Sequence, residues 1–164
     1  MSARRAEGFT LIEIVVVIVI IAVLINFAVL SFSRISGAGP LKEESDRLHT
    51  LLRMASEEAL LRSRLIGVDI TEEGYAFLRL DQGEWKPLED DLFRSRELPD
   101  ELRLSIATTQ PPGDDEEKRT PEIILLNSGE MTPFELKISS RESDDYYRLS
   151  GSETGELELN HVTP

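Results

Sequence analysis

Residues 8–32 read GFTLIEIVVVIVIIAVLINFAVLSF, and this stretch decides how the chain is organised. Residues 9–32 include eighteen Phe, Leu, Ile or Val residues, and Glu13 is the only charged residue among them. A helix over these residues would be about 36 Å long at about 1.5 Å per residue, and a bilayer hydrocarbon core is about 30 Å thick. We therefore predict a transmembrane helix over 9–32. Arg4 and Arg5 precede it and no comparable basic cluster follows closely, so we expect a cytoplasmic N-terminus.

Beyond the apolar run the helical pattern is interrupted and then resumes. The break falls at 37–40, where the glycines weaken a helix and Pro40 lacks a backbone donor. From 41 to about 64, apolar residues recur at i, i+3, i+4 and i+7, which predicts an amphipathic helix with one buried stripe. The stripe comprises Leu48, Leu51, Leu52, Ala55 and Ala59. The polar residues Glu43, Glu44, Asp46, Arg53, Glu57 and Arg62 are expected mostly on the other face. Residues 33–65 are thus predicted to continue the helical spine.

Residues 66–164 change to a pattern of short strands, which predicts an antiparallel β domain. The predicted strands are 66–70, 75–80, 102–107, 123–126, 134–138, 146–149 and 156–159. The first two are separated by four residues that include Gly74, which is typical of a hairpin. Residues 108–121 contain three prolines and a charge run, so we predict a mobile loop there. A helical spine followed by an antiparallel sheet is an α+β fold.

Aromatic residues and glycines of this region are expected to be structural. Tyr75, Phe77, Trp85 and Phe134 are predicted to lie in the core or on a sheet face, and Gly67, Gly74 and Gly129 in turns or bulges.

Composition excludes several kinds of site. The net charge of −13 argues against nucleic-acid binding, which needs clustered Lys and Arg. The absence of cysteine rules out a disulfide or a thiolate site, and His49 and His161 are the only histidines. We find no catalytic or metal-binding pattern and expect no cofactor. The acidic runs 89–91, 114–117 and 144–145 lack the ligand spacing of a calcium loop and are better read as solvated loops, although calcium binding at one of them stays open.

The stretch Gly8-Phe9-Thr10-Leu11-Ile12-Glu13, behind a short basic leader, resembles the class III signal of type IV pilins and type II secretion pseudopilins. The resemblance implies that residues 1–8 are a leader, which a prepilin peptidase cuts after Gly8 before it methylates the new N-terminus at Phe9. It also implies that Glu13 takes part in assembly by pairing with the N-terminus of a neighbouring subunit. An ionisable group inside a membrane helix is costly, which supports a functional role for Glu13.

Two other interpretations of this region remain. Glu13 could simply lie in the headgroup zone of an ordinary anchor, or the run could be a secretory signal cut near Ser36-Gly37-Ala38. The sequence also departs from many family members, because residues 9–32 contain no proline. The expected kink therefore shifts to 37–40.

The rest of the chain is similar to the H-type minor pseudopilins of type II secretion. The stretches that carry this likeness are 58–62 (EALLR), 66–68 (IGV), 74–77 (GYAF), Trp85, 98–99 (LP) and 128–134 (SGEMTPF). The resemblance implies a pilin-like fold, with a long N-terminal helix packed on an antiparallel β domain. It implies a structural subunit, not an enzyme, at or near the tip of the periplasmic pseudopilus, which helps to export folded proteins across the outer membrane. A minor pilin of a type IV pilus is the alternative, and a membrane-anchored periplasmic enzyme is a more distant one.

The resemblance also implies partners and a location. The partners would be other major and minor pseudopilins, the prepilin peptidase and the inner-membrane assembly platform, with the secretin and secreted substrates as further candidates. The chain would cross the inner membrane once, with its C-terminal domain in the periplasm.

Overall fold

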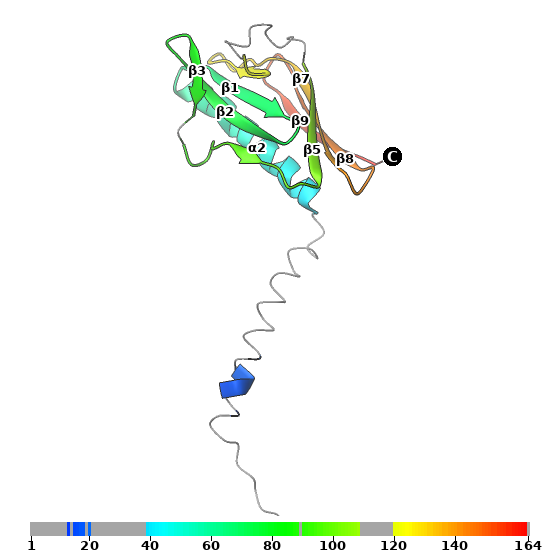
Figure 1. The fold of residues 1–164 in the computed structure, drawn as a ribbon. Helices are drawn as coiled ribbons and strands as arrows, with labels where there is room; N and C mark the ends of the chain where they lie inside the picture. Colours follow the sequence, from blue (N-terminus) through cyan, green and yellow to red (C-terminus); the bar gives the residue numbers. More distant parts are fainter. Residues whose placement is uncertain are drawn as a thin grey trace, which may run out of the picture. The chain divides into compact units, whose positions relative to one another are not determined.

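The computed structural model describes Glu13 and residues 15–18, 20, 39–88, 90–108 and 120–163 (Figure 1). The chain divides into two units, Met1–Gly39 and Pro40–Pro164. In the first unit, Glu13 and residues 15–18 and 20 are helical. No helix within the described residues is long and apolar enough to cross a membrane. The predicted leader and most of the predicted transmembrane helix lie outside the described residues, as does most of the predicted loop 108–121.

The second unit, called the head here, begins with the helix α2 (Pro40–Leu61). Pro40 is well suited to the first helical position, because its missing N–H would have no intrahelical partner there. The predicted apolar stripe is confirmed, since all five of its residues are at most 4 % exposed. The helix ends three residues before the predicted end at Arg64, and Ser63 takes a left-handed backbone conformation (φ 49°).

Two antiparallel sheets pack with α2. The first has the order β3-β2-β1-β6, with β4 also paired to β2, and the second has the order β5-β7-β8-β9. The first sheet contains β1 (Ile66–Thr71), β2 (Gly74–Asp81), β3 (Glu84–Pro87), β4 (Arg96–Glu97) and β6 (Ile123–Leu125). The second contains β5 (Leu102–Thr108), β7 (Phe134–Ser140), β8 (Tyr146–Gly151) and β9 (Leu157–Val162). All seven predicted strands are present, and the predicted hairpin is β1–β2.

Sequence reasoning missed β3 and β4. The turn that joins β2 to β3 is Gln82-Gly83, and both residues have positive φ angles, 53° and 87°. The sequence signal for such a two-residue turn is usually Asn-Gly or Asp-Gly. Because Gln82 stands in place of Asn or Asp, the hairpin could not be recognised from the sequence. β4 has two residues and exists through its pairing with β2, which no local pattern reveals.

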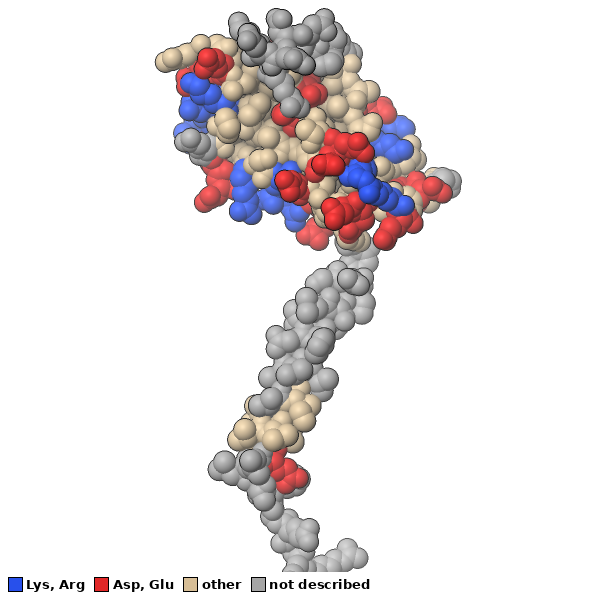
Figure 2. All heavy atoms as spheres, in the orientation of Figure 1, with Lys and Arg blue, Asp and Glu red and all other residues tan. Residues whose placement is uncertain are grey.

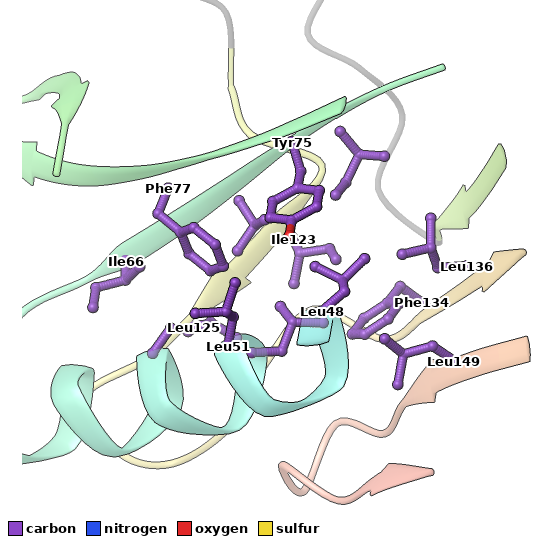
Figure 3. Packing of buried hydrophobic residues seen from close by; sticks show 14 of the residues in the cluster. Leu48, Leu51, Ile66, Tyr75, Phe77, Ile123, Leu125, Phe134, Leu136 and Leu149 are labelled. Carbon is purple, nitrogen blue, oxygen red and sulfur yellow. The ribbon is translucent and has the colours of Figure 1, made fainter. Parts of the chain in front are cut away.

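The core lies where α2 meets the two sheets (Figure 3). Leu48 and Leu51 of α2 point toward the aromatic rings of the first sheet and the aliphatic side chains of the second. Phe77 is 1 % exposed, and its ring centroid lies 5.3 Å from that of Phe93. Tyr75 and Phe134 are buried as predicted, whereas Trp85 is half-buried on a sheet face.

Two of the three glycines are not turn residues. Gly67 lies in β1, where an added Cβ atom would be 2.3 Å from Pro121 Cγ and 2.9 Å from the ring of Trp85. Gly74 lies in β2, where a Cβ atom would be 2.3 Å from the backbone oxygen of Arg96. The turn or bulge prediction was therefore wrong for both, because close packing and not backbone conformation requires glycine there. It was right for Gly129, which has a φ of 93°.

A carboxylate extends the pairing of β1 with β6. The register ends at Val68 opposite Ile123, and beyond it the N–H of Ile70 donates to Glu122 Oε2 at 2.7 Å. Burial raises the pKa of Glu122 above its ordinary 4.5, and the nearby Asp69 carboxyl raises it further, against the lowering effect of the Ile70 N–H. A carboxyl with a raised pKa in the folded state stabilises the fold at low pH, and that stabilisation is lost as the pH rises.

Replacing Glu122 with Gln should therefore change how stability depends on pH. The Gln side chain mimics the protonated acid, so the variant should gain stability relative to the wild type as the pH rises from about 4.5 to 7.5. Urea unfolding across this range, in a fragment that begins at Pro40, measures the difference. Glu158→Gln, at an exposed position of β9, controls for the loss of one charge. A difference that stays constant with pH would contradict the assignment.

Candidate assembly site

The predicted site residues lie in the first unit, and the structure describes one of them. Gly8 and Phe9 lie outside the described residues. Glu13 is helical and exposed. The helical residues that follow it present apolar side chains to the surroundings, and they are between 44 % and 59 % exposed: Val15, Val16, Val17, Ile18 and Ile20. The described part of this segment therefore carries one carboxylate next to apolar side chains that are exposed in the isolated chain.

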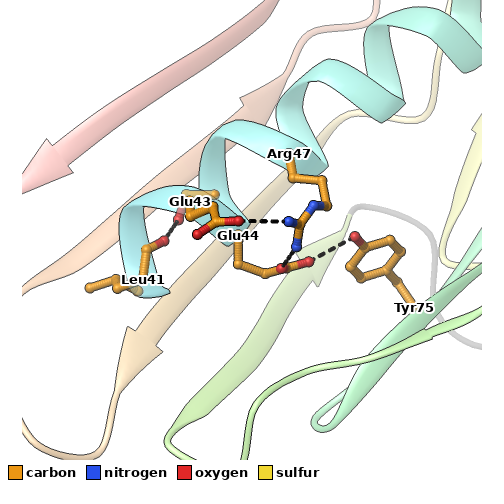
Figure 4. A network of polar contacts seen from close by, with 6 residues as sticks. Leu41, Glu43, Glu44, Arg47 and Tyr75 are labelled. Carbon is orange, nitrogen blue, oxygen red and sulfur yellow. Dashed lines mark hydrogen bonds and ion pairs between the residues drawn. The ribbon is translucent and has the colours of Figure 1, made fainter. Parts of the chain in front are cut away.

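In the head, a buried carboxylate joins α2 to the first sheet (Figure 4). Glu44 is 6 % exposed, and its Oε1 accepts a hydrogen bond from the Tyr75 hydroxyl at 2.9 Å. Its Oε2 pairs with the guanidinium of Arg47, which also reaches Glu43 Oε1 at 2.9 Å. A buried carboxylate requires such partners, because desolvation alone disfavours its charged form.

The expectation that Glu44 faces solvent with the other polar residues was wrong. Glu44 lies four positions before Leu48 and seven before Leu51, so it shares their face of the helix. That spacing could have signalled its position. The hydroxyl that makes burial tolerable comes from Tyr75, on a strand 31 residues away, and no local pattern could reveal it.

Tyr75 acts as a permanent donor to this carboxylate. Burial raises the pKa of its hydroxyl, and the Glu44 charge and hydrogen bond raise it further, while Arg96 and Arg47 oppose the shift. Since the ordinary value is 10.0 and the shift is upward, Tyr75 stays protonated at physiological pH.

The solvent-facing side of α2 carries oppositely charged side chains at i and i+4. The pairs are Lys42–Asp46 at 2.6 Å, Glu43–Arg47 at 2.9 Å, Arg53–Glu57 at 3.7 Å and Glu58–Arg62 at 3.1 Å. Exposed pairs of this kind contribute little to stability, because water and salt screen the attraction. Figure 2 shows acidic and basic side chains interleaved at the lower edge of the head. The ion pairs of α2 therefore keep the solvent-facing side of this helix polar, and they add little to the stability of the fold.

The histidines and acidic runs were the remaining candidates from the sequence. Within the part of the chain that the structure describes, no group of three or more potential ligands could hold a metal ion. His161 lies in β9, and its ring stacks on that of Tyr147 with the ring centroids 4.6 Å apart. His49 is half-buried on α2. The acidic run 114–117 lies outside the described residues.

An apolar N-terminal segment that carries one acid, followed by a head in which a helix packs on antiparallel sheets, defines the chain as pilin-like. The family model described as type II transport protein GspH matches residues 44–155, and a prokaryotic N-terminal methylation motif matches residues 3–25. The chain therefore belongs to the GspH family of type II transport proteins.

Individual relatives agree with this assignment. Type II secretion system protein H of Pseudomonas aeruginosa is 36% identical over 150 residues, which cover 84% of this chain and 86% of that protein. The protein of the same name from Aeromonas hydrophila is 27% identical and covers 97% of this chain. The minor pseudopilin EpsH from the type 2 secretion system of Vibrio cholerae has a similar structure, with a TM-score of 0.63 and 28% identity, over 74% of this chain and 96% of that chain. The predicted pilin-like fold is confirmed.

The buried hydrogen bond should be visible in stability measurements. Tyr75→Phe leaves Glu44 Oε1 buried without its donor, which should lower the free energy of unfolding by about 1–3 kcal/mol. Tyr146→Phe, which removes a half-buried bond from Arg148, should cost less. In a double-mutant cycle, Glu44→Leu should be less harmful when Tyr75 is already Phe. Additive effects in chemical unfolding would show that the two side chains are not coupled.

Proposed function

We propose that this H-type minor pseudopilin of type II secretion is a membrane-anchored structural subunit at or near the tip of the periplasmic pseudopilus. There it would help to export folded proteins across the outer membrane by mechanical work, without catalysing a reaction. One observation carries the proposal: a methylation motif over residues 3–25 and a GspH head over residues 44–155 occur in a single chain. The first supports processing and anchoring, and the second supports the place in secretion.

The proposed maturation starts at the leader. A prepilin peptidase would cut between Gly8 and Phe9 and methylate the amine of Phe9, and both residues lie within the matched motif. The apolar run from 9 to 32 would then hold the chain in the inner membrane, because each apolar residue at the centre of such a helix favours insertion. The basic residues before the run support a cytoplasmic N-terminus and a periplasmic head.

The proposed role of Glu13 follows from electrostatics in lipid. A carboxylate and an ammonium about 4 Å apart attract by about 4 kcal/mol at an effective dielectric constant near 20, which is comparable to the cost of placing a charge in the membrane. Cleavage after Gly8 would create that ammonium on Phe9. Pairing between the Glu13 of one subunit and the Phe9 of the next would set their axial register.

The proposed partners are other major and minor pseudopilins, the prepilin peptidase and the inner-membrane assembly platform. The secretin and secreted substrates are further candidates. Contacts with other pseudopilins would use the exposed apolar residues after Glu13, which a single chain leaves uncovered.

Blocking the leader site should stop maturation. Gly8→Arg should leave a precursor that keeps residues 1–8, whereas the wild type should yield a chain that begins with methylated Phe9. Gly39→Arg serves as the control, because nothing lies within 4 Å of a Cβ atom at that position. Mass spectrometry of the membrane fraction measures both N-termini. A mature N-terminus beyond residue 32 would mean that the run is an ordinary signal peptide.

Removing the Glu13 carboxylate should impair assembly but not insertion. Glu13→Val should still enter the membrane, since the loss of a charge lowers the cost of insertion. Crosslinking to partner pseudopilins through a cysteine at Val17 should fall by roughly tenfold or more, given the size of the lost attraction. Secretion should fall with it, although a subunit at the tip has a neighbour on one side and could retain part of the effect. Glu57→Val, at an exposed position of the head, is the matched control. Undiminished crosslinking and secretion would remove Glu13 from the assembly mechanism.

A further inference from the structure

The last turn of α2 presents two leucines to solvent. Leu60 is 51 % exposed and Leu61 is 80 % exposed, the largest exposure among the large apolar residues that the structure describes. Leu60 Cδ1 lies 3.9 Å from the position that a Cβ atom on Gly129 would take. The end of the helix is therefore adjacent to the turn that follows β6, although Leu60 and Gly129 are 69 positions apart in the sequence.

That turn borders a surface hollow of about 270 Å³. The hollow is lined by Ile124, Leu126, Met131 and Pro133, together with Glu130 and Glu153. Two backbone hydrogen bonds hold the turn, from Gly129 N to Leu126 O at 3.1 Å and from Leu126 N to Glu130 O at 2.9 Å. Gly155 packs so closely that a Cβ atom on it would be 2.2 Å from Gly129 O. The hollow is thus held by two turns that support each other.

The rim of the hollow is acidic. Glu130 and Glu153 are both exposed, and in the described part of the chain neither forms an ion pair. The basic residues that follow the end of α2, Arg62 and Arg64, both pair with Glu58, at 3.1 Å and 2.5 Å. An apolar centre surrounded by a charged rim is the general anatomy of a protein–protein interface.

We propose that this end of the head, formed by Leu60, Leu61 and the hollow between Glu130 and Glu153, docks a segment of another pseudopilin in which an apolar side chain lies next to Lys or Arg. The apolar side chain enters the hollow beside the leucines, and the basic group pairs with the carboxylates at the rim. Complementary charge selects this kind of segment, because a neutral or acidic segment leaves both carboxylates without a counterion. The inference rests on the proposed function, since it takes the partner to be a neighbouring subunit.

The absence of cysteine in the sequence makes a clean crosslinking test possible. The full chain carries Asn127→Cys, which lies exposed in the turn beside the hollow, or Thr50→Cys, which lies exposed on α2. In secreting cells, each is labelled with a benzophenone maleimide and irradiated, and the products are probed for every other pseudopilin. We expect an adduct from Asn127→Cys with one pseudopilin and none with that protein from Thr50→Cys.

Variants at the surface then test its chemistry. Leu61→Asp should reduce the adduct roughly tenfold or more, because it places a charge among the apolar contacts. The pair Glu130→Lys and Glu153→Lys should reduce it by a similar factor, because the reversed rim charges repel the basic group of the partner. The pair Glu142→Lys and Glu158→Lys makes the same change in net charge at exposed positions elsewhere and should have no effect. All of these positions are exposed, and protease resistance of the head reports that each variant is folded.

Three results would overturn the inference. These are no adduct with any pseudopilin, an adduct with an exported protein or a second copy of this chain instead, or an adduct that survives all the surface variants. Crosslinking through a cysteine at Val17 in the same cells separates this inference from the proposed function. If Val17 crosslinks and Asn127 does not, the docking surface is wrong while the subunit assignment stands.

Discussion

The apolar stripe of α2 is the constraint on which the head depends. All five of its residues are buried, in one core cluster with residues of both sheets. Fully burying a side chain such as Leu48 or Leu52 contributes about 1.5–3 kcal/mol, so the stripe as a whole outweighs any ion pair on the helix surface. The need to cover this stripe explains why α2 packs against strands of both sheets.

Polar groups are accommodated around the stripe and do not compete with it. The carboxylate of Glu44 is buried at the edge of the stripe, and the Tyr75 hydroxyl and Arg47 satisfy it. The carboxyl of Glu122 replaces a backbone acceptor where the pairing of β1 with β6 ends. Both carboxyls connect segments that are distant in the sequence, Glu44 through a side-chain hydroxyl and Glu122 through a backbone N–H.

The two units of the chain differ in the kind of side chain that they expose. The described part of the N-terminal unit exposes apolar side chains, which is tolerable in lipid or against other helices but not in water. The head is instead closed on itself, with charged residues over most of α2's outer surface. The exceptions to this polar covering, Leu60 and Leu61, lie at one end of the helix, next to the acidic hollow.

The sequence by itself determined the class of fold, the apolar run, the processing motif and the positions of seven strands, because each is a local pattern of period or composition. The stripe on α2 was predicted for the same reason, since helical spacing alone identifies Leu48, Leu51 and Leu52. Only the tertiary structure decided that the strands form two sheets and that Glu44 is buried. It also decided that position 67 must be glycine, because Pro121 and Trp85 occupy the space that a Cβ atom would need. The surface at Leu60 and Glu130 likewise exists because two turns and a helix end meet. Such contacts join residues that are tens of positions apart, and each depends on which residue the fold brings close. A repeating pattern of apolar and polar residues therefore cannot predict them.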